Sequence, residues 1–134
     1  MDITYNNQKT LQKQQLQDLF LSVEWDSGNY PEKLTQAIAS SHGVFTAWDG
    51  DQLVGLINVL SDGYMAAYIH YLLVRPEYQG KGIGKTLISK MVEAYAEVPT
   101  KLLVSYQSEA GFYERQGFQD QTDKAAMFMT SMTL

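Results

Sequence analysis

A glycine-rich turn between an apolar strand and a helix is the feature that most restricts how this 134-residue chain can fold. Residues 68–74 are rich in β-branched and aromatic side chains and predict a strand, which an apolar helical pattern follows. The turn between them contains three alternate glycines, Gly80, Gly82 and Gly84. Glycines leave backbone N–H groups uncovered at the start of a helix, where the helix dipole favours an anion. With Lys81 and Lys85 beside them, they predict a phosphate-binding loop.

Two familiar phosphate loops do not fit this turn. Gly84-Lys85-Thr86 matches the end of a P-loop, but the first glycine of that motif would have to occupy position 79, which is Gln79. The dinucleotide-binding pattern G-x-G-x-x-G also fails, because the glycines here are spaced G-x-G-x-G. A P-loop nucleotide-binding protein is therefore a weak alternative.

The rest of the chain predicts an α+β domain that spans residues 1–134, with the element order β-αα-βββ-α-β-α-β. Strands are expected at 2–6, 44–48, 53–60, 68–74, 101–106 and 127–129. A helix after Thr10 would bury Leu16, Leu19, Phe20 and Val23, and one starting at Pro31 would bury Leu34, Ala37 and Ile38. A third helix would follow the glycine turn and a fourth would run from Ser108 to Gln116. Residues 68–106 then form one β-α-β unit.

Composition excludes several classes of protein. The net charge of −5 argues against non-specific nucleic-acid binding, which needs a basic face. The chain has no cysteine, which removes disulfides, thiolate nucleophiles and cysteine-based metal sites. Its apolar runs are shorter than a membrane span needs, and its first ten residues lack the pattern of a signal peptide. These features predict a cytoplasmic protein without nucleic-acid or membrane partners.

The segment Gln79-Gly80-Lys81-Gly82-Ile83-Gly84 resembles the Gln-x-x-Gly-x-Gly element of the GNAT (GCN5-related) N-acetyltransferases. The strand and turn before it, Leu72 to Tyr78, are also similar to that family. A second element, Phe112-Tyr113-Glu114-Arg115-Gln116-Gly117-Phe118, resembles the family's FYE-x-x-GF motif. The resemblance implies the GNAT fold, a mixed and mostly antiparallel central sheet flanked by helices, over nearly the whole chain.

The resemblance also implies an acetyl-CoA site that needs no metal. In this family the loop amides hold the pyrophosphate, and the matching positions here are Gln79, Gly80, Lys81, Gly82, Ile83, Gly84 and Lys85. The backbone at Leu72, Leu73 and Val74 would pair with the pantetheine arm, and one of these N–H groups would stabilise the thioester oxygen.

Tyr113 matches the tyrosine that protonates the departing thiolate in many relatives, although a helix tyrosine can also simply pack on the core. The general base stays unassigned. Many relatives carry an acidic residue where this chain has Tyr71, and an asparagine where it has Tyr106. His70 titrates near neutrality and is one candidate, and a chain of water molecules is another.

Residues 24–30 occupy the place of the family's substrate-binding loop. Trp25 and Tyr30 are expected to form an aromatic wall for an amine, or Trp25 alone plugs the core between two helices. Glu24 and Asp26 would favour a cationic substrate. A homodimer contact through residues 127–129 is left open. The leading function is transfer of an acetyl group to a primary amine of a small molecule or peptide, and the alternative is a non-catalytic module that binds acetyl-CoA or CoA.

Overall fold

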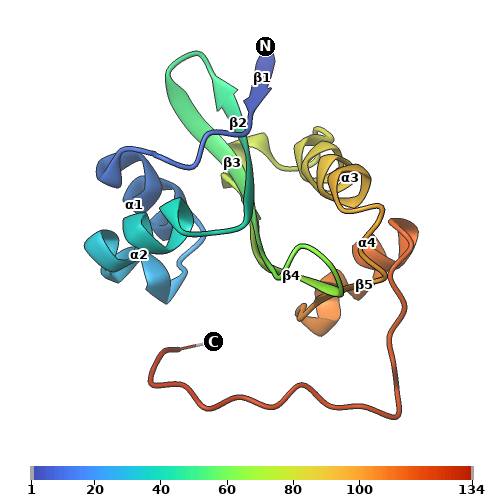
Figure 1. The fold of residues 1–134 in the computed structure, drawn as a ribbon. Coiled ribbons are helices and arrows are strands. Elements are labelled where there is room, and N and C mark those ends of the chain that lie inside the picture. The colour runs from blue at the N-terminus through green and yellow to red at the C-terminus, as the bar shows by residue number, and fades with distance from the viewer. Residues whose placement is uncertain (1, 134) are drawn as a thin grey trace.

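The computed structural model describes residues 2–133, which form a five-stranded sheet with helices on both faces (Figure 1). The strands lie in the order β1-β2-β3-β4-β5. Their bounds are β1 Ile3–Asn6, β2 Gly43–Asp49, β3 Gln52–Ser61, β4 Ala66–Val74 and β5 Thr100–Leu103. The helices are α1 Lys13–Ser22, α2 Pro31–Ala39, α3 Ile83–Ala94 and α4 Ala110–Arg115, with short 3₁₀ turns at Asp26–Asn29, Pro76–Tyr78 and Gln107–Glu109.

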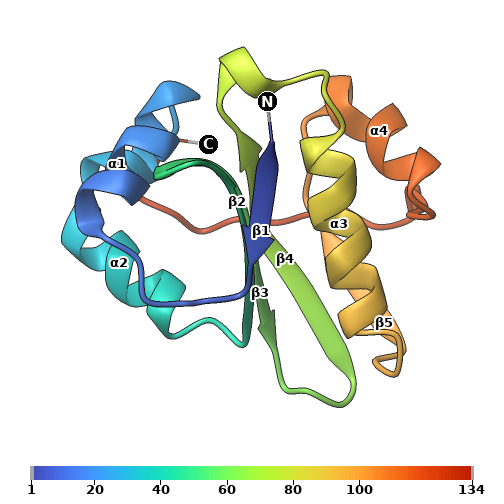
Figure 2. The same cartoon turned by 90° about the horizontal axis from the view of Figure 1, so that it is seen from above.

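The sheet separates two hydrophobic cores. α1 and α2 cover one face and α3 and α4 lie on the other, as Figure 2 shows from above. Leu16, Leu19 and Phe20 of α1 are fully buried against the first face. α3 packs on the second face through Leu87, Ile88 and Met91, close enough that a Cβ on Gly55 of β3 would lie 3.2 Å from the Leu87 side chain.

The connections follow the expected turn chemistry. β2 and β3 form a hairpin closed by Gly50, whose φ of +58° lies in the left-handed region that favours glycine. Strands β1 to β4 pair with their neighbours in antiparallel fashion. β5 pairs with β4 in parallel, and helix α3 forms the crossover connection between these two strands. The predicted β-α-β unit and the mixed sheet are thereby confirmed. No helix within residues 2–133 is long and apolar enough to cross a membrane.

The structure differs from the sequence prediction in several places, including the last predicted strand before α4, which ends at Leu103 and not at Tyr106. Residues 127–129 form no strand, because no edge of the sheet lies beside them to supply backbone hydrogen bonds. The observed element order therefore ends at α4. Ala37 is exposed rather than buried, since α2 faces the sheet with Leu34 and Ile38 alone. The fourth helix begins at Ala110, and the preceding residues 107–109 form a 3₁₀ turn.

Candidate active site

β4 and the edge strand β5 diverge partway along β4. β4 pairs with β5 only from Ala66 to Ile69, opposite Thr100 to Leu103. Beyond Ile69, β4 continues to Val74 beside β3 alone. In the part of the chain that the structure describes, residues 70–74 therefore have no strand on their β5 side. The backbone at Leu72, Leu73 and Val74 borders this gap in strand pairing, which is called the opening below.

A bulge in β4 lies at the point of divergence. Val59 of β3 faces Ile69, and the next residue, Asn58, faces Tyr71, so His70 is the extra residue. The buried Asn58 side chain compensates for the disrupted ladder, because its Oδ1 accepts a hydrogen bond from the Tyr71 N–H at 2.8 Å. Its Nδ2 donates to Ser41 Oγ at 3.0 Å, and Ser41 Oγ donates to the Ala37 carbonyl at 2.9 Å. Each group in this chain of buried polar atoms has a partner.

The glycine turn lies at the end of β4 and opens α3. Gly80 and Gly82 have φ values of +77° and +85°, and a Cβ at either would meet nothing within 4 Å. The glycines are therefore required by backbone conformation, and the turn presents its main chain on an open side. Gln79 Nε2 donates to the Val74 carbonyl at 2.9 Å and ties the turn to the strand.

The first amides of α3 are left without helical partners at this turn. The first hydrogen bond of the helix runs from Thr86 N–H to the Gly82 carbonyl at 3.0 Å, so the N–H groups of Ile83, Gly84 and Lys85 have no acceptor within the helix. Gly82 is the N-cap residue and provides no side-chain cap. Lys81 and Lys85 are exposed beside these amides, and neither takes part in an ion pair within residues 2–133. The turn thus combines free N–H donors with unpaired positive charge.

α4 closes the other side of the opening. A Cβ on Gly84 would lie 3.7 Å from Phe112 of α4 and 3.9 Å from Val74 of β4, so the turn, the strand and α4 converge there. The Tyr113 ring packs edge-on against Phe112 and Phe118, with ring centroids 5.1 and 6.2 Å away. Within residues 2–133 the Tyr113 hydroxyl forms no hydrogen bond. Every buried side-chain N or O atom in that range has a hydrogen-bond partner, so the Tyr113 hydroxyl is not buried and reaches solvent.

The surroundings of Tyr113 keep its hydroxyl protonated. Burial, with a smaller contribution from the Glu109 carboxylate, raises the pKa of Tyr113 to about 12. At neutral pH the group is therefore a proton donor and not a base.

Aromatic rings from β4 and from the turn after α1 gather on the opposite face of the sheet. Tyr71 packs edge-on against Phe20, with ring centroids 4.8 Å apart, and lies 6.0 Å from Trp25. His70 stacks on Tyr71 at 4.0 Å and on Tyr68 at 5.8 Å. The bulge places His70 and Tyr71 next to each other on this face, and partial burial there lowers the pKa of His70.

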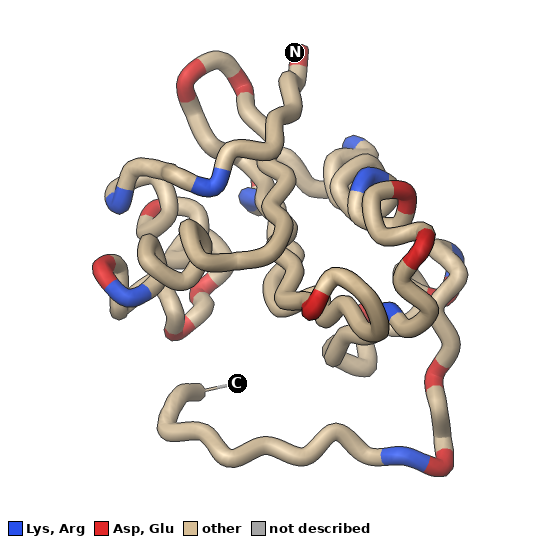
Figure 3. The backbone as a smooth tube through the Cα atoms, in the orientation of Figure 1, with Lys and Arg blue, Asp and Glu red and all other residues tan. Residues whose placement is uncertain are grey.

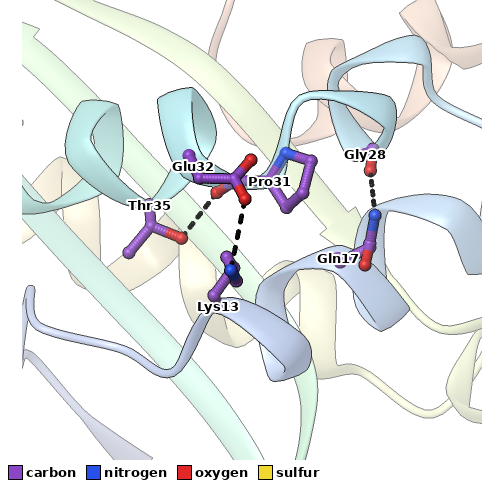
Figure 4. A network of polar contacts seen from close by, with 6 residues as sticks. All are labelled: Lys13, Gln17, Gly28, Pro31, Glu32 and Thr35. Carbon is purple, nitrogen blue, oxygen red and sulfur yellow. Dashed lines mark hydrogen bonds and ion pairs between the residues drawn. The ribbon is translucent and has the colours of Figure 1, made fainter.

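The turn that carries Trp25 is held by polar contacts. Ser27 Oγ and Tyr71 Oη are 2.6 Å apart and share a hydrogen bond. Gln17 of α1 donates to the Gly28 carbonyl at 2.9 Å, and Lys13 and Glu32 join α1 to α2 at 3.2 Å (Figure 4). Trp25 is thereby fixed beside Tyr71, with part of its surface left exposed.

The structure does not bring Tyr30 to this aromatic group. Tyr30 is 46% exposed and forms no aromatic pair within residues 2–133. It lines a separate hollow with Asn29, Glu32, Lys33 and Gln36. The aromatic side chains that pack beside Trp25 are Phe20 and Tyr71, and the sequence indicated Tyr71 only as a replacement for an acidic residue.

Sequence reasoning also missed Asn58 and Ser27. The signal for Asn58 was present, because an asparagine in the middle of an otherwise apolar strand, 53–60, must have buried hydrogen-bond partners. Ser27 carried no comparable signal, since serine is ordinary in a turn.

Comparison with known proteins agrees with this architecture. The family model described as an acetyltransferase (GNAT) domain matches residues 5–130. A GNAT-family acetyltransferase structure from Streptococcus pneumoniae TIGR4 is 28% identical, with a TM-score of 0.81 over 98% of each chain. An aminoglycoside N-acetyltransferase in complex with CoA has the same fold at 10% identity, with a TM-score of 0.72 over 97% of this chain and 95% of that one.

Curated relatives are similar over different shares of their length. An uncharacterized N-acetyltransferase of Pyropia yezoensis is 27% identical over 123 residues, which cover 87% of this chain and 70% of the relative. The chloroplastic GCN5-related N-acetyltransferase 2 of Arabidopsis thaliana is 36% identical over 70 residues, 51% of this chain, and the match spans only 27% of that protein. Because the family model covers almost the whole chain, the protein belongs to the GNAT family of acetyltransferases.

Proposed function

We propose that this chain, as a single domain, transfers the acetyl group of acetyl-CoA to a primary amine of a small molecule or peptide. The observation that carries the proposal is the glycine turn with two left-handed residues, Gly80 and Gly82, at the mouth of the opening between β4 and β5. The turn offers free amides for a pyrophosphate, and the opening offers an unpaired strand edge for an extended arm.

The fit to acetyl-CoA rests on three groups of atoms. The amides of residues 79–85 would hold the pyrophosphate, with Lys81 and Lys85 supplying charge. The free edge of β4 at Leu72, Leu73 and Val74 would bind the pantetheine arm as an added strand. The aminoglycoside N-acetyltransferase of the same fold is known in complex with CoA, which supports this class of ligand.

Acetyl-CoA, when bound, supplies a thioester whose carbonyl carbon a neutral amine can attack. The role of this chain is to position the two reactants and to move protons. Tyr113 has a protonated hydroxyl that reaches solvent beside the opening, and it donates a proton to the departing thiolate. One backbone N–H of residues 72–74 stabilises the developing charge on the oxygen.

His70 is the group of this chain suited to remove the proton from the amine. It lies where β4 leaves β5, and its lowered pKa keeps the imidazole mostly uncharged at neutral pH. An uncharged imidazole can accept the proton that the attacking amine loses.

The aromatic face of the sheet, where the acceptor amine would bind, favours aromatic or cationic amines. Trp25, Tyr71, His70 and Tyr68 present aromatic rings on this face of the sheet, and such rings attract cations. Glu24 and Asp26 add negative charge to the adjoining turn. Tyr30, which lies in a separate hollow, has no part in this surface.

The test measures release of the CoA thiol with acetyl-CoA and a panel of aromatic, cationic and acidic amines. Turnover that depends on both acetyl-CoA and an amine supports the proposal. Tight binding of acetyl-CoA in calorimetry without turnover of any amine would favour the non-catalytic module. The observation that supports this alternative is the presence of Tyr71 where many relatives carry an acidic residue. No binding of acetyl-CoA by the folded protein would contradict both.

A further inference from the structure

The side chain of Tyr71 is fixed by contacts from three elements. Its hydroxyl shares a hydrogen bond of 2.6 Å with Ser27 Oγ, and its backbone N–H donates to Asn58 of β3 at 2.8 Å. The ring packs edge-on against Phe20 of α1 at 4.8 Å and lies tilted beside Trp25 at 6.0 Å. Of these contacts, only the bond to Ser27 acts on the hydroxyl end of the side chain, and it joins β4 to the turn after α1.

Ser27 lies in a turn that is packed tightly on α1. The turn is the 3₁₀ helix Asp26–Asn29. Its next residue, Gly28, is buried so close to α1 that a Cβ there would lie 2.8 Å from the Leu21 side chain. Gln17 of α1 donates to the Gly28 carbonyl at 2.9 Å (Figure 4). The position of the Ser27 hydroxyl is therefore set by α1 through this turn.

The His70 imidazole, in contrast, is held by aromatic rings. It stacks on Tyr71 at 4.0 Å, with 21° between the ring planes, and on Tyr68 at 5.8 Å and 27°. Within residues 2–133 no side-chain hydrogen bond holds the imidazole, and β4 carries no Lys, Arg, Asp or Glu, so its tube is tan in Figure 3. Burial alone lowers the pKa of His70. The orientation of the imidazole therefore depends on the rings beside it.

We propose that Ser27 is a positioning residue, which fixes the Tyr71 ring through its hydroxyl and thereby sets the orientation of the His70 imidazole stacked on that ring. The reaction step that uses this orientation, transfer of the amine proton to an imidazole nitrogen, rests on the function proposed above. Ser27 acts through Tyr71 and does not touch the reacting atoms. The turn after α1 and the proton acceptor on β4 then behave as one connected unit.

Stacking is suited to this role because of where the imidazole binds its proton. The nitrogen lone pair lies in the plane of the imidazole, whereas a stacked ring contacts its face. Tyr71 can therefore fix the tilt of the His70 ring and leave its nitrogens free. Proton transfer requires the donor and the acceptor to lie within hydrogen-bond reach and in line. A Tyr71 ring that is free to tilt would thus impair the chemical step more than the binding of acetyl-CoA.

The first test needs no substrate and follows the two histidines of the chain by NMR. Protons over the face of an aromatic ring resonate upfield, so Ser27→Ala should move the His70 imidazole signals toward those of an unstacked histidine. The pKa of His70 should also move closer to the ordinary value of about 6.5 as water reaches the ring. His42, which is bonded to Tyr95 at 2.7 Å, is the internal reference, and its signals should not move. Unchanged His70 signals in Ser27→Ala would overturn the proposal.

The second test is a double-mutant cycle on turnover. Ser27→Ala and Tyr71→Phe remove the same hydrogen bond and keep the ring, so each should lower kcat about 10–100-fold, the range for a misplacement of about 1 Å. The KM for acetyl-CoA should stay unchanged, and the double variant should lose no more than either single variant. Ser27→Thr keeps a hydroxyl and should restore kcat. Additive losses in the double variant would overturn the proposal.

Ser22→Ala is the matched control for the cycle. It removes a serine hydroxyl bond of the same length, 2.6 Å, to the Leu19 carbonyl of α1, and it should keep the wild-type kcat. An equal loss of kcat in Ser22→Ala and Ser27→Ala would show a general effect on α1 and overturn the proposal.

The two tests separate this inference from the proposed function. His70 signals that move in Ser27→Ala, in a protein that turns over no amine, would support the positioning of His70 and contradict the acetyl transfer. Turnover by the wild type, with His70 signals that stay in place in Ser27→Ala, would support the acetyl transfer and overturn the role of Ser27.

Discussion

The side-chain oxygen of Asn58 accepts a hydrogen bond from the backbone N–H of Tyr71 at 2.8 Å. The bond crosses from β3 to β4 at the bulge, where no backbone partner is available for that N–H. It therefore fixes the strand at the level where β4 leaves β5, and with it the positions of His70 and the Tyr71 ring.

Replacing Asn58 with leucine should weaken both the fold and the site. The variant keeps a similar side-chain volume but leaves the Tyr71 N–H and Ser41 Oγ without their present partner, at a cost of about 1–3 kcal/mol in the free energy of unfolding. Urea unfolding measures this loss, and kcat/KM should fall as well. Ser41→Ala is the control, because it breaks only the outer link and should reduce stability with less effect on kcat/KM. Equal kinetic losses in the two variants would argue against a specific role for the bond to Tyr71.

Gly82→Asp should abolish tight binding of acetyl-CoA. The substitution adds a negative charge and a Cβ at a residue with a φ of +85°, beside the amides proposed to hold the pyrophosphate. Gly50→Asp is a matched control, since Gly50 also has a positive φ and open space around it but closes the β2–β3 hairpin. Both variants should lose about 1 kcal/mol of stability through backbone strain. Calorimetry should show weaker binding only for Gly82→Asp, and unchanged binding in that folded variant would contradict the loop assignment.

Tyr113→Phe should lower kcat by about 10²–10⁴-fold, the usual contribution of a general acid. The variant keeps the ring that packs on Phe112 and Phe118, so its melting temperature should change little. Tyr64→Phe, on a tyrosine that is 79% exposed in the β3–β4 turn, should keep the wild-type kcat. Because the pKa of Tyr113 is about 12, the wild-type enzyme should show no loss of this proton up to about pH 10. A Tyr113→Phe variant with full kcat would make this tyrosine structural only.

The stability of the protein should decrease on acidification through His70. Its pKa in the folded protein lies below the ordinary 6.5, so the unfolded chain binds more protons in this range, and the free energy of unfolding rises with pH there. The contribution is present above about pH 6.5 and is lost as the pH falls through the folded pKa. An NMR titration of the His70 imidazole in the native and urea-unfolded protein measures the difference directly. A native pKa equal to or above the unfolded one would contradict the assigned burial.

The turn and most of the strands could be predicted because their determinants are local. The glycines at positions 80 and 82 indicate a turn with left-handed backbone, and the apolar and β-branched residues predict β2 to β4. The bulge at His70 could not be predicted, since it depends on the register between β3 and β4 and on a side chain that is distant in sequence, Asn58. Residues 127–129 have the composition of a strand, but a strand also needs an edge to pair with, which composition does not reveal.

The neighbours of Trp25 could not be predicted, for a similar reason. Trp25 and Tyr30 are close in sequence, but the short 3₁₀ helix Asp26–Asn29 separates them and turns Tyr30 toward α2. The ring that lies beside Trp25 comes from β4, and only the packing of α1 on the sheet brings it there.

The brief ladder between β4 and β5 makes the sheet uneven in its resistance to local opening. Only Ala66 to Ile69 connect β5 to the other strands, whereas β2 and β3 pair along most of their length. Separating β5 exposes less apolar surface than unfolding the whole domain, so its amide hydrogens exchange with solvent by a lower-energy opening. A molecule that binds to both β4 and β5 where they diverge stabilises β5 against this local opening. It therefore slows amide hydrogen exchange in β5 and leaves the exchange of the β2–β3 hairpin unchanged.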